Sequence, residues 1–284
     1  MTIVVTGATG QLGRLVVESL LRRGASPADV VATGRDEARL AELATSGVRT
    51  AVTDYADAAS LAAAFQGADR VLLISGSEFG QRLPQHTAVV EAAKAAGVGQ
   101  LLYTSIAHAD TALMALATEH RETERVIRES GIPFTLLRNS WYLENYLSQV
   151  PTYLEHGVVG ATRGGRISAA TRADYADAAA VALLADDSAG QVLELGGPSF
   201  TLAELAATVA SVSGREVTAT EVSAEELTAI LVGAGLPQGY AQVLASADEG
   251  IGRGELEVST GDLERLIGRP PTTLREAIEQ TLTP

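Results

Sequence analysis

The chain has 284 residues, of which 46% are hydrophobic, and a formal net charge of -14. This length and apolar content predict one large folded domain with a smaller appended lobe, and the negative charge argues against nucleic acid or an anionic membrane as a partner. There is no cysteine, which excludes disulfides, thiolate catalysis and cysteine-ligated metals. The four histidines have no metal-ligand spacing, so no metal is expected. The apolar runs are too short for membrane insertion.

The first predicted strand, residues 2–5, runs directly into the sequence Gly-Ala-Thr-Gly-Gln-Leu-Gly. The first glycine allows a sharp turn, the second leaves room for a phosphate, and the third lets a helix pack closely on the sheet. The free N–H groups and positive dipole end of that helix favour an anion. The pattern predicts a dinucleotide site, although a helix entry without a ligand is the alternative. The residues expected at the pyrophosphate are Gly7, Thr9, Gly10, Gln11, Leu12 and Gly13.

The start of the sequence shows no charged and then apolar leader before this strand, so we expect a cytoplasmic protein. Further along, helix-like stretches end in glycine and are followed by short aliphatic segments, which predict strands at 29–33, 48–52, 70–74, 100–104 and 134–137. The glycines are Gly47, Gly67, Gly97 and Gly131, and glycine accepts the left-handed backbone just past a helix. The alternation predicts an α/β fold with a Rossmann-type doubly wound parallel sheet and function at the carboxyl ends of its strands.

The end of the second strand is where dinucleotide folds distinguish NAD from NADP. No carboxylate stands at the strand tip, and the guanidinium of Arg35 can hold a 2′-phosphate with two hydrogen bonds. The sequence therefore favours NADPH, with weaker use of NADH left open by Asp36. The alternative makes Arg35 a solvated loop charge beside Asp36.

Later strand ends add candidates for the rest of the coenzyme. Ser75 and Gly76 follow the fourth strand and are expected beneath the phosphates and ribose, and Asp54 is expected near the adenine, with an ordinary turn as its alternative. His108, in the loop after the fifth strand, is either part of the acceptor site or a plain loop residue.

The segment after the sixth strand, Asn139-Ser140-Trp141-Tyr142, combines an amide with aromatic rings. Such groups can hold the nicotinamide and stack on a planar acceptor, and we expect all four of these residues to contact the coenzyme. The alternative is that Trp141 and Tyr146 are core packing.

The predicted domains are 1–150, the NADP-binding Rossmann domain to which 172–195 returns, and a smaller substrate-binding lobe formed by 151–171 and 196–284. A helix is expected over 172–185. Two capping boxes, Thr201 with Glu204 and Ser223 with Glu226, predict further helix starts in the lobe.

Five segments together resemble the NmrA-like atypical short-chain dehydrogenase/reductases over essentially the full chain. They are the glycine run at 7–13, Arg35, Ser-Gly at 75–76, Gly-Ile-Pro-Phe-Thr-Leu-Leu-Arg-Asn at 131–139 and Thr-Arg-Ala-Asp-Tyr-Ala at 171–176. Within that family, residues 78–82, 84–86, 108–110 and 139–142 are most similar to the bacterial NAD(P)H:quinone oxidoreductases of type 2. The resemblance implies NADPH, a quinone acceptor and no flavin, and relatives that reduce triphenylmethane dyes.

The chain departs from the wider superfamily because residues 110–130 lack the Tyr-x-x-x-Lys pair. By resemblance, His120 stands where relatives often carry a cofactor-touching Lys; the alternative is a surface His paired with Glu124, one helical turn away. The catalytic residue therefore stays unknown, with His108, His120 and Asn139 as candidates.

The missing pair also bears on the substrate. Reduction of an aliphatic ketone gives an alkoxide that needs a positioned acid, whereas reduction of a quinone gives a phenolate-type anion whose conjugate acid has a pKa of about 10. We therefore expect direct hydride transfer to a quinone or dye. The sequence leaves the oligomeric state open between a monomer and a homodimer. The alternatives are a non-catalytic NADP(H)-sensing regulatory protein, and a nucleotide-sugar epimerase or dehydratase.

Overall fold

The computed structural model describes residues 1–282, which divide into two compact units. The first unit comprises 1–105, 119–138 and 172–193, and the second comprises 106–118, 139–171 and, within the described residues, 194–282. This division differs from the predicted domain boundaries, because the chain leaves the first unit directly after its fifth and sixth strands rather than at residue 150.

The first unit is built on a seven-stranded, mostly parallel sheet. Its strands are β1 (Ile3–Val5), β2 (Val30–Gly34), β3 (Arg49–Val52), β4 (Arg70–Leu73), β5 (Gln100–Ile106), β6 (Phe134–Asn139) and β8 (Val192–Leu195). Their order is β3-β2-β1-β4-β5-β6-β8, and β1 pairs in parallel with both β2 and β4. The six predicted strands are confirmed, and β8 was not predicted. The strand order reverses between β1 and β4, which is where doubly wound folds bind their ligands.

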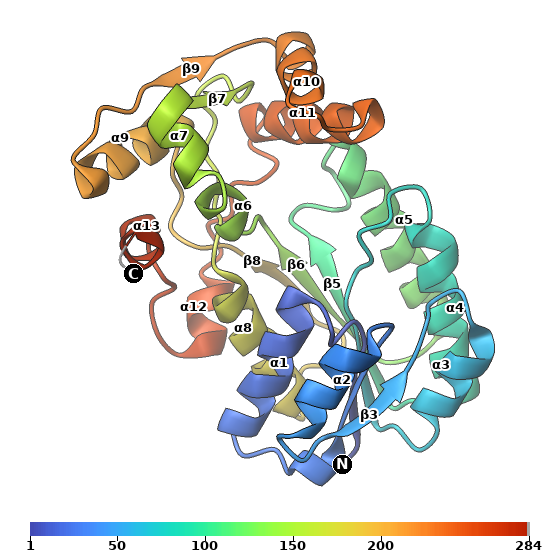
Figure 1. Ribbon diagram of the computed structural model, residues 1–284. Coiled ribbons are helices and arrows are strands. Elements are labelled where there is room, and N and C mark those ends of the chain that lie inside the picture. Colours follow the sequence, from blue (N-terminus) through green and yellow to red (C-terminus); the bar gives the residue numbers. More distant parts are fainter. Residues whose placement is uncertain (283–284) are drawn as a thin grey trace. The chain divides into compact units, whose positions relative to one another are not determined.

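Helices cover both faces of this sheet (Figure 1). They are α1 (Gln11–Arg22), α2 (Glu37–Ala44), α3 (Ala58–Phe65), α4 (Arg82–Ala95), α5 (Ala115–Ser130) and α8 (Arg172–Leu184), with a short 3-10 turn, η1 (Pro27–Asp29). Helix α1 packs against α8, and α3 packs against α4. The glycines predicted to follow helices have φ between 69° and 86°, so the left-handed backbone expected there is confirmed.

The second unit is mainly helical. Its elements are α6 (Glu144–Leu147), α7 (Val150–His156), β7 (Val158–Gly160), α9 (Leu202–Ser213), β9 (Ala219–Glu221), α10 (Ala224–Gly233), α11 (Gln238–Gly252), α12 (Asp262–Ile267) and α13 (Leu274–Leu282). Strands β7 and β9 form a separate two-stranded parallel sheet. Both predicted capping boxes are confirmed, at the starts of α9 and α10.

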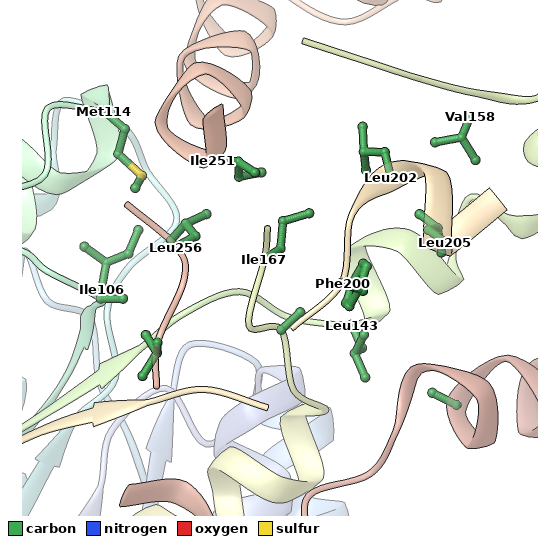
Figure 2. Packing of buried hydrophobic residues seen from close by; sticks show 14 of the residues in the cluster. Ile106, Met114, Leu143, Val158, Ile167, Phe200, Leu202, Leu205, Ile251 and Leu256 are labelled. Atoms are coloured by element: carbon green, nitrogen blue, oxygen red, sulfur yellow. The ribbon is translucent and has the colours of Figure 1, made fainter. Parts of the chain in front are cut away.

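The core of the second unit brings together side chains from several of these elements. Figure 2 shows Ile167 between Leu256 and Phe200, with Leu202 and Leu205 of α9 nearby. Trp141 and Tyr146 are partly buried against the same cluster. None of the helices in residues 1–282 has both the length and the apolar character that a membrane span requires.

Candidate functional site

The glycines determine the shape of the turn between β1 and α1. Gly7 has a φ of 60°, and the carbonyl oxygen of Gly7 accepts from the Gly10 N–H at 2.9 Å. A β-carbon placed on Gly13 would lie 2.6 Å from Cα of Ala8, so only glycine lets α1 begin this close to the strand. This geometry supports the sharp turn predicted at Gly7 and the close packing predicted at Gly13.

The start of α1 is left open to an anion. Its N-cap is Gly10, which has no side chain to accept from the first-turn N–H groups, and no acidic residue lies in that turn. Gln11 is exposed and Leu12 is buried. The free N–H groups and the positive end of the helix dipole can therefore serve a negatively charged ligand.

Arg35 lies just after β2, and its partner is Glu78 rather than Asp36. Its Nη1 donates to Oε1 of Glu78 at 2.7 Å, and this hydrogen bond and charge raise the pKa of Arg35, to which the charge of Asp54 adds. Asp36 instead caps α2 by accepting from the N–H of Arg39 at 3.1 Å. The exposed Arg35 guanidinium is thus paired with a carboxylate from the loop after β4.

Two residues beside the glycine-rich turn were missed by sequence reasoning. Arg39 donates from Nη1 to the Thr9 carbonyl oxygen at 2.9 Å, which places a second guanidinium beside the glycine-rich turn. The hydroxyl of Tyr55 donates to the carbonyl oxygen of Ile74 at 2.8 Å and lies 2.5 Å from Oγ1 of Thr6. Arg39 could have been found from the sequence, because it lies four residues after Arg35. No sequence pattern pointed to Tyr55.

Asp54 makes a local contact, and Ser75 makes one to a neighbouring strand. Asp54 accepts from the N–H of Ala56 at 2.9 Å, which supports the ordinary turn role left open for it. The N–H of Ser75 donates to Oγ1 of Thr104 at 2.9 Å, so the end of β4 is tied to the adjacent strand.

Gly76 is held on both sides by buried side chains of α4. Its N–H donates to Nε2 of His86 at 3.0 Å, and its carbonyl oxygen accepts from Nε of Arg82 at 3.0 Å. Because Nε2 accepts, the ring proton of His86 lies on Nδ1, which faces Oγ1 of Thr123 at 3.0 Å. Burial, with the charge of Arg82, lowers the pKa of His86 to about 3. A neutral imidazole therefore positions the backbone at Gly76.

His120 is buried on α5, and its Nδ1 lies 2.7 Å from the hydroxyl of Tyr103. The alternative of a surface His paired with Glu124 is wrong, because Glu124 is itself buried and accepts from Nη2 of Arg138 at 2.7 Å and from Oγ of Ser105 at 2.6 Å. Burial, followed by the charge of Arg82, holds the pKa of His120 well below its usual range. His120 is therefore a neutral, packed side chain.

The second unit holds the remaining predicted residues. Asn139 is buried, and its Oδ1 has no hydrogen-bond partner within residues 1–282. Ser140 is also buried and donates from Oγ to the Leu256 carbonyl oxygen at 2.8 Å. The unpartnered Asn139 acceptor fits a ligand that donates an N–H group.

Three side chains of the second unit have structural roles that bear on the open alternatives. Tyr146 packs edge-on against Phe200 at 5.7 Å between ring centroids, and Trp141 borders the same core, as core packing requires. His108 has a φ of 51°, and its Nε2 lies 3.0 Å from the Glu257 carbonyl oxygen. No group of three or more His, Asp or Glu side chains that could hold a metal ion occurs in the part of the chain that the structure describes.

The fold and the glycine-rich turn agree with the family to which the sequence is matched. The chain belongs to the NmrA-like family, whose model matches residues 1–279. It is 48% identical over 278 residues to quinone oxidoreductase 2 of Escherichia coli (strain K12), covering 97% of each chain. It superposes with a TM-score of 0.96 on the crystal structure of the E. coli NADPH-dependent quinone oxidoreductase QOR2 complexed with NADPH, at 47% identity over 99% of this chain and 100% of that one.

A dye reductase has a similar structure. The Citrobacter sp. triphenylmethane reductase complexed with NADP(H) gives a TM-score of 0.93 at 36% identity, over 99% of this chain and 100% of that one. The predicted family and fold class are confirmed.

Proposed function

We propose that this chain is an NADPH-dependent quinone reductase that passes a hydride directly to a planar acceptor without a flavin. The observation that carries the activity is the 48% identity to quinone oxidoreductase 2 over 97% of both chains. The turn at Gly7–Gly13 independently supports a dinucleotide, because its geometry and the open start of α1 suit a pyrophosphate. A cytoplasmic location and a monomeric or homodimeric state stay predictions.

Different residues are proposed to bind different parts of NADPH. The first-turn N–H groups of α1 would hold the pyrophosphate and Arg35 would hold the 2′-phosphate. In the second unit, the buried Oδ1 of Asn139 offers an acceptor that would suit the carboxamide of the nicotinamide. His86 and Arg82 fix the backbone at Gly76. When bound, NADPH supplies the hydride.

The acceptor needs little acid–base help from the protein. Both buried histidines of the first unit, His86 and His120, have a lowered pKa and are neutral near pH 7, so neither supplies an imidazolium acid. A quinone tolerates this, since its phenolate-type product has a conjugate acid with a pKa of about 10 and takes its proton from water. The protein contributes proximity and an aromatic surface, for which Trp141 and Tyr142 are the proposed residues.

Steady-state oxidation of NADPH with a panel of small quinones and triphenylmethane dyes tests the proposal. We expect turnover with quinones, and Arg35→Ala should raise the KM for NADPH about tenfold or more while that for NADH changes less than about twofold, because a charged hydrogen bond contributes about 1.5–3 kcal/mol. Binding of NADPH without oxidation by any acceptor would favour the NADP(H)-sensing alternative instead.

The second candidate is a triphenylmethane-type dye reductase, favoured by the likeness to the Citrobacter enzyme. The same panel separates the two, because a dye reductase would give a higher kcat/KM with cationic dyes than with every quinone. A coenzyme that stays bound and unconsumed through purification would point to the epimerase or dehydratase alternative.

A further inference from the structure

The guanidinium proposed to hold the 2′-phosphate already has an anionic partner from within the chain. Arg35 Nη1 donates to Oε1 of Glu78 at 2.7 Å, and the other carboxylate oxygen accepts from Nε2 of Gln85 at 2.9 Å. The side chains of Arg35 and Glu78 are 64% and 44% exposed, so solvent and ligands reach the pair. A carboxylate thus makes the kind of contact that a phosphate oxygen makes with arginine.

The loop that carries Glu78 is held on both sides of it. Gly76 is bound through both its N–H and its carbonyl oxygen by α4, as described above, and the N–H of Gly80 donates to Oε1 of Glu119 at 2.9 Å. Glu119 is itself fixed by Arg82 at 2.7 Å, where the two side chains are 14% and 7% exposed. A typical exposed ion pair loses much of its benefit to side-chain entropy, but here the backbone carrying Glu78 is held in place by buried groups.

Each member of the pair favours the charged form of the other. Hydrogen bonds from Arg35 and then Gln85 lower the pKa of Glu78, while Glu78 raises the pKa of Arg35. The neighbouring guanidinium of Arg39 is engaged with the Thr9 carbonyl oxygen and with Asp36.

We propose that Glu78 sets the coenzyme preference by competing with the 2′-phosphate for Arg35. This inference rests on the proposed function, because it requires NADPH to meet Arg35. With NADH the Arg35–Glu78 pair persists, whereas with NADPH the 2′-phosphate shares the guanidinium with Glu78 or displaces it, and two like charges approach each other. Glu78 therefore weakens NADPH binding selectively and keeps NADH usable.

The test is calorimetric binding of NADP⁺ and NAD⁺ to the full chain, which does not depend on turnover. Glu78→Gln keeps the side-chain shape and removes the charge, and it should tighten NADP⁺ about three- to tenfold while NAD⁺ changes less than about twofold. The effect should shrink in about 0.5 M salt and should vanish in an Arg35→Ala background.

Glu129→Gln is the matched control, because Glu129 pairs with Arg125 on α5 at the same 2.7 Å and is also exposed. It removes the same charge from a pair outside the site and should leave both dissociation constants unchanged. If Glu129→Gln tightened NADP⁺ binding as much as Glu78→Gln does, the change in net charge alone would explain the effect. That result would overturn the proposal.

The remaining outcomes separate this inference from the proposed function. If Arg35→Ala weakens NADP⁺ selectively but Glu78→Gln shifts NADP⁺ and NAD⁺ by the same factor, or weakens NADP⁺, the competition is wrong and the Arg35 role stands. If Arg35→Ala leaves NADP⁺ binding unaffected, the competition by Glu78 and the proposed role of Arg35 both fail. If both variants behave as expected but no quinone is reduced, the competition stands and the proposed activity fails.

Discussion

Replacing Gly13 by alanine should destabilise the protein although Gly13 lies inside a helix. Alanine in a helix interior is normally favoured over glycine by up to about 1 kcal/mol. At Gly13, however, the new β-carbon would lie 2.6 Å from Cα of Ala8 and closer still to the carbonyl oxygen of Gly7, so backbone atoms must move. Overpacking of this kind costs about 1–3 kcal/mol. The net expectation is a loss of up to about 2 kcal/mol.

The matched control is Gly239→Ala in the first turn of α11, where an added β-carbon meets nothing within 4 Å. Urea unfolding should give a lower midpoint for Gly13→Ala and an equal or higher one for Gly239→Ala. Calorimetry should show weaker NADP⁺ binding only for Gly13→Ala, because displacing the start of α1 moves its free N–H groups. Equal stabilisation by both substitutions would refute the close-packing argument.

Three further predictions concern buried polar groups. Arg138→Met should lower the free energy of unfolding by about 3–5 kcal/mol in urea, because Glu124 keeps a buried charge without this partner; a loss below 1 kcal/mol would contradict this. The folded pKa of His86 is about 3, below its unfolded value, so stability should fall as pH drops from about 6.5 toward 3 by up to about 1.4 kcal/mol per pH unit. His86→Gln should flatten that slope, and an unchanged slope would count against a neutral His86. Asn139→Leu should leave the urea midpoint nearly unchanged but weaken NADPH about tenfold, since Oδ1 is a buried acceptor with no partner among residues 1–282; unchanged binding would remove Asn139 from the proposed coenzyme site.

The sequence was most informative where local rules decide the structure. Glycine spacing at 7–13, aliphatic strands and the capping box at Thr201 each depend on neighbours within a few residues, and the structure has all three. Strand β8 and the β7–β9 pair escaped prediction. Strand β7 pairs with β9 across about sixty residues of chain, which no local pattern reveals.

The site residues that escaped prediction depend on long-range contacts. Glu78 meets Arg35 from 43 residues away, and the hydroxyl of Tyr103 meets His120 inside the first unit. A polar side chain on a helix is expected at the surface from composition alone, so the burial of His120 required knowledge of its partner.

During synthesis, helix α1 is made long before the helix that covers it. Its buried residues Val16, Val17 and Leu20 lie on a helix that packs against α8, and Ser19 donates to Asp177 of α8 at 2.6 Å. The ribosome makes α8 about 150 residues after α1, and the chain enters the second unit twice in between. The nascent first unit therefore presents an uncovered apolar helix face until residue 184 has emerged, and fragments ending near residue 150 should aggregate rather than fold.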